Sequence, residues 1–241
     1  MQTIFIVSSG RSGSKALSEA FVDAPYTLSL HGPDKFEKAN CLNYKGKLKS
    51  PKKIIINKRK QLVEMAHTRG LHYVENSWFI STFVKELSEV FPDCIIVHLV
   101  RDGRDFVRSG MSRKWFTGNK KFLNSESAWT RDHWTPPAIH KDRLSKVCWL
   151  WNEQQEVIHS QMIKLPEKNN GGVIHFEKLI TEDLSKYMEQ WGINCEGPIY
   201  MKKVNVTNNY KVPHWSEWNV RQIGKCKKIM GKSLEQHGYK F

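Results

Sequence analysis

The sequence predicts an α/β protein with a central parallel sheet flanked by helices. Two apolar runs carry this prediction, TIFIVS at 3–8 and CIIVHLV at 94–100, because short, nearly continuous apolar segments are typical of strands buried in parallel sheets. Segments in which apolar residues recur at helical spacing alternate with the strand candidates, as the crossovers between parallel strands require. We expect a sheet of about five strands, which is a common size.

The individual elements follow from their local patterns. The strand at 3–8 leads through SSGRSGS into KALSEAFVDA, which has helical composition. Further strands are expected at 71–77, at 94–100 and within 171–179, and helices at 79–90, 142–165 and 216–238. The basic stretch 43–61 predicts an exposed loop with a short strand at Ile54–Ile56, and the stretch 113–141, rich in Trp, Lys and Pro, predicts an inserted loop.

The composition fits one folded domain spanning 1–241 with the insertion around 113–141. Lys and Arg number 38 against 24 Asp and Glu, so the net charge is +14 and the pI is about 9.5, which favours anionic partners. No run of 18 apolar residues exists, and the first residues lack the pattern of a signal peptide, so we expect a soluble, cytoplasmic protein without a transmembrane segment. The five cysteines have neither zinc spacing nor redox-pair spacing.

A glycine-rich turn, Ser8–Lys15, follows the first strand and precedes a helix. Such a turn directs backbone N–H groups at one point, and the helix N-terminus adds partial positive charge, so the pattern predicts a phosphate-binding loop. It differs from a Walker A loop, because Gly10 and Gly13 are three apart and Ala16 stands where a magnesium-binding hydroxyl would be. The alternative is an ordinary strand-to-helix turn.

A second set of polar residues, RDGRDFVRS at 101–109, follows the strand at 94–100. Ligands in open α/β sheets bind beyond the carboxyl ends of the strands, and the guanidinium of Arg101 with the hydroxyl of Ser109 could hold a second phosphate there. The alternative is a surface ladder in which Arg101, Asp102, Arg104 and Asp105 pair at helical spacing.

Together these motifs make the chain resemble the sulfotransferases that use 3′-phosphoadenosine 5′-phosphosulfate. SGRSGSKAL at 9–17 is similar to the 5′-phosphosulfate loop of that family, and Arg101 with Ser109 eight residues later is similar to its 3′-phosphate motif. HFEKL at 175–179 and the C-terminal helix are weaker matches. The resemblance implies a fold like that of the P-loop NTPases, a nucleotide donor and no metal.

The resemblance also implies a role for individual residues. Arg11 would contact the transferred sulfuryl group as a catalytic residue, and Arg101 and Ser109 would hold the 3′-phosphate. The backbone that would hold the 5′-phosphate comprises Ser12, Gly13, Ser14, Lys15 and Ala16.

The resemblance suggests Glu75, in VENS at 74–77, as the general base that activates the acceptor. This segment is similar to the Glu-Lys-Ser segment of the carbohydrate-modifying branch, but Asn76 replaces the lysine. His31 and His72 are the alternative bases, and Glu75 could instead be a strand-end carboxylate paired with an arginine.

We therefore expect sulfuryl transfer to a hydroxyl or amine of a small molecule or carbohydrate. The insertion at 113–141 would lie on the acceptor side, with Trp115, Trp129 and Trp134 as candidate acceptor contacts, whereas Trp149, Trp151 and His98 are expected in the core. One rival function is a nucleotide or small-molecule kinase of the P-loop type. The other is a basic nucleic-acid-binding module, although we regard a nucleic-acid partner as the weaker expectation.

Overall fold

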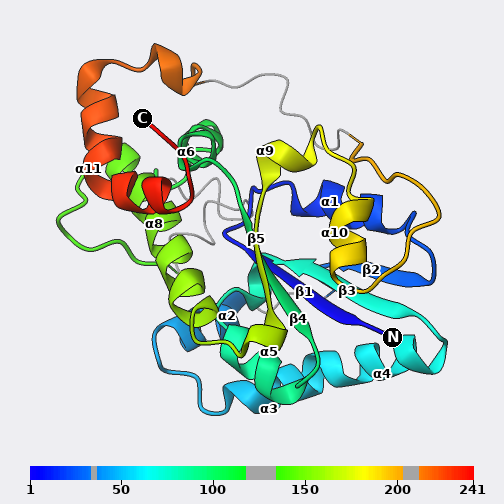
Figure 1. The fold of residues 1–241 in the computed structure, drawn as a ribbon. Coiled ribbons are helices and arrows are strands. Elements are labelled where there is room, and N and C mark those ends of the chain that lie inside the picture. Colours follow the sequence, from blue (N-terminus) through cyan, green and yellow to red (C-terminus); the bar gives the residue numbers. More distant parts are fainter. Residues whose placement is uncertain (34–36, 118–133, 203–211) are drawn as a thin grey trace. The chain divides into compact units, whose positions relative to one another are not determined.

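The computed structural model describes residues 1–33, 37–117, 134–202 and 212–241. Five strands form one parallel sheet in the order β2-β3-β1-β4-β5 (Figure 1). They are β1 (Thr3–Ser8), β2 (Thr27–His31), β3 (His72–Ser77), β4 (Ile95–Val100) and β5 (Asn170–His175). The predicted α/β fold with a central parallel sheet is confirmed.

Helices connect the strands and continue to the C-terminus. The α-helices are α1 (Ser14–Phe21), α2 (Glu37–Tyr44), α3 (Pro51–Ile55), α4 (Gln61–Thr68), α5 (Val84–Val90), α6 (Gly103–Ser112), α8 (Arg143–Met162), α9 (Phe176–Leu179), α10 (Ser185–Gln190) and α11 (Val220–Gln236). A π-helical turn, η1 (Ile56–Lys60), joins α3 to α4, and 3₁₀ turns occur at η2 (Trp78–Ile80), η4 (Glu167–Asn169) and η5 (Trp215–Glu217).

The chain divides into two compact units. Unit 1 comprises Met1–Val100 and Val157–Asn205 and contains the whole sheet, whereas unit 2 comprises Arg101–Glu156 and Val206–Phe241. The expectation of a single domain over 1–241 stays a prediction. Much of the predicted insertion at 113–141, including Trp129, lies outside the described residues.

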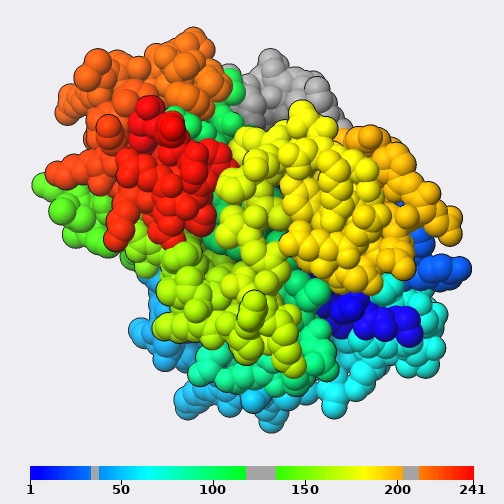
Figure 2. All heavy atoms as spheres, in the orientation of Figure 1, coloured from blue at the N-terminus to red at the C-terminus, as the bar shows by residue number. Residues whose placement is uncertain are grey.

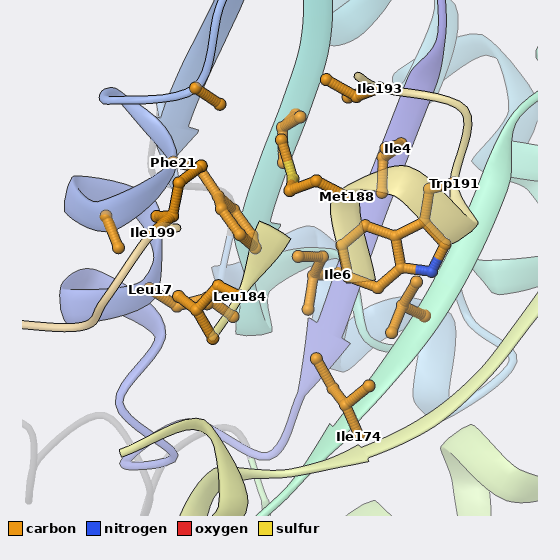
Figure 3. Close-up of a cluster of buried hydrophobic side chains, with 14 of the residues drawn as sticks. Ile4, Ile6, Leu17, Phe21, Ile174, Leu184, Met188, Trp191, Ile193 and Ile199 are labelled. Carbon is orange, nitrogen blue, oxygen red and sulfur yellow. The ribbon is translucent and has the colours of Figure 1, made fainter. Parts of the chain in front are cut away.

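One face of the sheet in unit 1 is covered by α1 and α10. Ile4 and Ile6 of β1 point to this face, where Phe21, Met188 and Trp191 complete a buried cluster (Figure 3). The rings of Phe21 and Trp191 meet edge to face with centroids 6.1 Å apart. Figure 2 shows the segment from α9 through α10, in yellow and gold, at the surface.

The opposite face of the sheet is covered by α3, α4, α5 and the end of α8. Phe5 and Val7, which alternate with Ile4 and Ile6 along β1, point to this second cluster. Every residue of β1 is buried, because the strand is central and packed on both faces. The sheet therefore forms the middle of three layers, as predicted.

Two expectations about local structure are corrected, and one strand was missed. The stretch 43–61, predicted as an exposed loop with a strand at Ile54–Ile56, is helical from Pro51 onwards, because Pro51 begins a helix whose Ile55 is completely buried against the sheet. β2 was not predicted, because its residues are only half-buried and its pattern is correspondingly weak. The helix predicted at 79–90 starts at Val84, after the 3₁₀ turn η2.

Unit 2 has its own packing, in which α11 lies against α6 and α8. The thiols of Cys148 and Cys226 lie 3.3 Å apart and are completely buried. Trp149 and Trp151 are buried as expected, but Trp115 and Trp134 are buried too. Their indoles are enclosed by protein, which corrects the expectation that these two contact an acceptor. Among the described residues, no helix is long and apolar enough to cross a membrane.

Candidate functional site

The loop between β1 and α1 has the backbone geometry of an anion-binding loop. Gly10, Arg11 and Gly13 all have positive φ, at 77°, 53° and 76°. Gly13 is the N-cap of α1 and has no side chain to cap the first turn of the helix. The first N–H groups of a helix have no partner within it, so those of Ser14, Lys15 and Ala16 are available to an anion.

One neighbouring side chain restricts this loop, and one side chain of the loop itself is buried without a partner among the described residues. A Cβ built on Gly13 would lie 2.0 Å from the ring of Phe176, so only glycine fits between the loop and α9. The hydroxyl of Ser12 is buried and has no hydrogen-bond partner among the described residues. An unpartnered buried hydroxyl in a loop of this shape fits a ligand that accepts a hydrogen bond.

The carboxyl ends of the neighbouring strands support the loop. Asn76 of β3 is buried and donates a 3.0 Å hydrogen bond to the carbonyl of Ser14, which fixes the start of α1. His31, the last residue of β2, is exposed, and its Nε2 lies 3.0 Å from Ser14 Oγ. Desolvation lowers the pKa of His31; the nearby charge of Lys15 lowers it further, and Glu19 opposes both. His31 is therefore biased towards the neutral imidazole, which can accept a proton.

Glu75 has a different environment from the one expected of a base. Its carboxylate is completely buried and lies 2.5 Å from Nε of Arg59, while Nη2 of Arg59 donates to it at 2.9 Å. The hydroxyl of Tyr73 donates to the same carboxylate at 2.8 Å. Glu75 thus has the arginine partner that the structural alternative expected, and its geometry argues against a base that meets the acceptor. Its catalytic assignment remains an untested prediction.

His72, the other candidate base, lies at the amino end of β3. Its Nδ1 accepts a 2.9 Å hydrogen bond from the backbone N–H of Gln2. The loop at 9–13 follows the carboxyl end of β1, which runs parallel to β3. His72 is therefore separated from the loop by the length of a six-residue strand, about 16–20 Å. Within unit 1, the geometry therefore favours His31 over His72.

In unit 2, the two predicted phosphate-binding residues lie before and within α6, because Arg101 precedes the N-cap residue Asp102 and Ser109 is in the last turn. Asp102 caps the helix by accepting from the N–H of Arg104 at 2.8 Å. Arg101 Nη2 lies 3.9 Å from Asp105, so one pair of the alternative charge ladder is present. Ser109 is buried, and its hydroxyl accepts a 2.7 Å hydrogen bond from Arg113. Sequence reasoning missed Arg113, although its spacing of four from Ser109 placed it on the same helix face.

Arg104 has a structural role at the start of α6. Its guanidinium binds Asp102 with two nitrogens, lies 3.8 Å from the ring centre of Trp215 and donates to the carbonyl of Lys240. These contacts tie the C-terminal residues to α6. Arg104 therefore supports the helix that carries Ser109.

Unit 1 contains one long basic segment. No acidic residue occurs between Lys38 and Val63, and all lysines at 45–60 are exposed. Among the lysines and arginines of this segment, Arg59 is the one that is buried, in its pair with Glu75. A separate cavity of about 400 Å³ lies among α2, α5 and α8, with Asn43, Glu86 and Gln161 in its wall, and none of the predicted site residues lines it.

Comparisons with known proteins give a structural likeness alone. No family model and no curated protein matches the sequence. The structure is similar to the sulfotransferase domain from the curacin biosynthetic pathway, at 15% identity and a TM-score of 0.57, over 100% of this chain and 98% of that one. It is also similar to a sulfotransferase from Alicyclobacillus acidocaldarius, at 13% identity and a TM-score of 0.58, over 100% of this chain and 97% of that one. The chain therefore has the fold of these two sulfotransferases.

Proposed function

We propose that the protein transfers a sulfuryl group from 3′-phosphoadenosine 5′-phosphosulfate to a hydroxyl or amine. The observation that carries this proposal is the loop at 9–13, where Gly10, Arg11 and Gly13 have positive φ and the buried hydroxyl of Ser12 has no hydrogen-bond partner among the described residues. The likeness of the fold to two sulfotransferases supports it.

In this proposal, the two ends of the donor are held by different parts of the chain. The N–H groups of Ser12, Gly13, Ser14, Lys15 and Ala16 hold the 5′-phosphate, with Arg11 at the sulfuryl group. Arg101 and Ser109 hold the 3′-phosphate. β1 and β4 are adjacent parallel strands, with Ser8 opposite Leu99, so the loops that follow them start at the same edge of the sheet. This is the edge at which ligands of α/β sheets bind.

The reaction requires charge stabilisation and removal of one proton. The acceptor oxygen or nitrogen forms a bond to sulfur while the bond from sulfur to the bridging phosphate oxygen breaks, and the bisphosphate nucleotide leaves with the electron pair. Arg11 and the loop N–H groups stabilise the negative charge that develops on that oxygen. The proton of the acceptor passes to a base.

We propose His31 rather than Glu75 as this base. His31 is exposed beside the loop, and its lowered pKa keeps the imidazole neutral near pH 7. Glu75 is enclosed by Arg59 and Tyr73 and has its charge satisfied there. Glu75 then acts on the site through the position of β3.

The competing kinase function has less support from the loop. Magnesium-dependent phosphoryl transfer of the P-loop type uses a Ser or Thr hydroxyl directly after the loop lysine, and Ala16 stands at that position. The proposed acceptor is a hydroxyl or amine of a small molecule or carbohydrate.

The test is transfer of labelled sulfuryl from the donor to a panel of alcohols, amines and carbohydrates, with release of 3′-phosphoadenosine 5′-phosphate measured in parallel. We expect transfer without added magnesium and its loss in Arg11→Ala. Phosphorylation of the panel by ATP and magnesium, with no use of the sulfuryl donor, would contradict the proposal.

A further inference from the structure

We propose that Arg113 is a further phosphate-binding residue, which supplies a second guanidinium to the 3′-phosphate beside Ser109. This inference rests on the proposed function and assigns a residue to the same donor. It comes from the contacts of Ser109 within unit 2.

Four polar side chains follow one another at intervals of four residues, from Arg101 through Asp105 and Ser109 to Arg113. Asp105 and Ser109 belong to α6, Arg113 is its C-cap residue and Arg101 precedes its N-cap, so this spacing places the last three on one face, about one turn apart. The contacts agree with the spacing: Arg101 lies 3.9 Å from Asp105, and Arg113 Nη1 donates to Ser109 Oγ at 2.7 Å. The hydroxyl therefore stands between a carboxylate on one side and a guanidinium on the other.

The hydroxyl of Ser109 alone is a weak phosphate ligand. It is neutral and donates one hydrogen bond, and Ser109 lies in the last turn of α6, where the helix dipole is negative. Asp105 adds a full negative charge one turn earlier. A phosphate at Ser109 therefore needs a cation nearby, and Arg101 is about two turns away.

Arg113 meets this need from the C-terminal end of the helix. Because Ser109 Oγ accepts from Arg113, its own hydrogen can be donated to a ligand. A phosphate oxygen that accepts this hydrogen lies within reach of the guanidinium already bound to Oγ. A guanidinium can also bind two phosphate oxygens at once, which a lysine cannot do.

The test compares two nucleotides that differ only in the 3′-phosphate. Binding of 3′-phosphoadenosine 5′-phosphate and of AMP is measured by calorimetry for the wild type, Arg113→Gln, Arg113→Lys and Arg108→Gln. Gln can still donate a hydrogen bond to Ser109 but has no charge. Lys keeps the charge but lacks the planar guanidinium that can bind two phosphate oxygens. Arg108 is the matched control, because it lies on the same helix, is half-buried and donates to the backbone of Val212.

We expect Arg113→Gln to weaken binding of the bisphosphate by about tenfold to a hundredfold, the usual range for a hydrogen bond to a charged group, while binding of AMP changes less than about twofold. Arg113→Lys should retain part of the preference for the bisphosphate over AMP, and Arg108→Gln should retain all of this preference. Equal weakening of both nucleotides in Arg113→Gln, or no weakening, overturns the inference. A wild type that does not prefer the bisphosphate over AMP overturns the proposed donor, and this inference with it.

Discussion

Arg59 and Glu75 form an ion pair in which both side chains are completely buried, with Arg59 Nε 2.5 Å from Glu75 Oε2. The arginine lies in the π-helical turn between α3 and α4, and the glutamate lies in β3. The pair therefore links the sheet to the helical layer beneath it. Tyr73 donates to the same carboxylate, so its charge is satisfied inside the protein.

This relationship predicts that Glu75→Gln reduces stability more than catalysis. Removing one partner of a buried ion pair leaves an uncompensated charge and costs ~3–5 kcal/mol. We expect this loss in the free energy of unfolding, measured with urea, while turnover per folded molecule stays near that of the wild type. The double variant Arg59→Met/Glu75→Leu should recover much of the stability, because it leaves no charge behind. A stable Glu75→Gln protein with turnover lowered ~10²-fold or more would instead identify Glu75 as the base.

Gly13 allows a second test, which concerns the shape of the loop. Gly13→Ala adds a methyl group at φ 76°, where a Cβ would clash with Phe176. We expect the free energy of unfolding to fall by at least ~1–3 kcal/mol, because the backbone is strained at this φ. Donor binding should weaken as well. Gly172→Ala is the matched control, because Gly172 has φ 78° and, apart from its chain neighbours, no atom of the described residues lies within 4 Å of its Cβ position. If both variants behave alike, contact with Phe176 does not fix the loop.

The environment of His31 predicts how its pKa responds to its neighbours. Lys15→Ala removes a charge that lowers the pKa and should raise it, whereas Glu19→Gln should lower it. Titration of the His31 ring by NMR measures both pKa shifts. A mere change in the burial of His31 would not produce shifts of opposite sign in the two variants.

The same environment sets the pH dependence of activity. If His31 is the base, only its neutral form is active. This form is protonated as the pH falls through the folded pKa, which lies below the usual value of about 6.5. The decline of kcat/KM at low pH should therefore move up in Lys15→Ala. A pH profile that is the same in the wild type, Lys15→Ala and Glu19→Gln would exclude His31 as the base. Full activity in His31→Ala would exclude it too.

Arg101 is predicted to contribute to donor affinity rather than to turnover. Arg101→Ala removes a charged phosphate ligand, worth ~1.5–3 kcal/mol, so donor binding should weaken about tenfold to a hundredfold with a smaller change in the rate of the bound complex. Single-turnover kinetics at saturating donor separates the two effects. Unchanged affinity would indicate that Arg101 only pairs with Asp105.

The sequence predicted those parts of the fold that have strong local signals. β1 and β4 are buried on both faces and read as apolar runs, and the loop at 9–13 has glycines at two of its three positions with positive φ. β2 escaped detection because it is only half-buried. Ile54–Ile56 was misassigned because β-branched residues favour strands, and only packing under the sheet makes this segment helical.

The partners of site residues depend on contacts between distant segments, which the sequence does not display. Nothing near Glu75 in the sequence indicates Arg59, 16 residues away, and nothing near Gly13 indicates Phe176. Arg113 is different, because its distance of four residues from Ser109 was visible. Helical spacing around a motif residue is therefore a signal that could have found it.

The central claim is that the protein binds a nucleotide through two separate phosphate sites, and nucleotide-dependent thermal stabilisation tests it most directly. The melting temperature is measured with 3′-phosphoadenosine 5′-phosphate, ADP, AMP, and ATP with magnesium, each at the same concentration. We predict that the 3′,5′-bisphosphate raises the melting temperature well above the shifts from AMP and ADP, without magnesium. Equal shifts from ADP and the bisphosphate, or a larger shift that requires ATP and magnesium, would contradict the account.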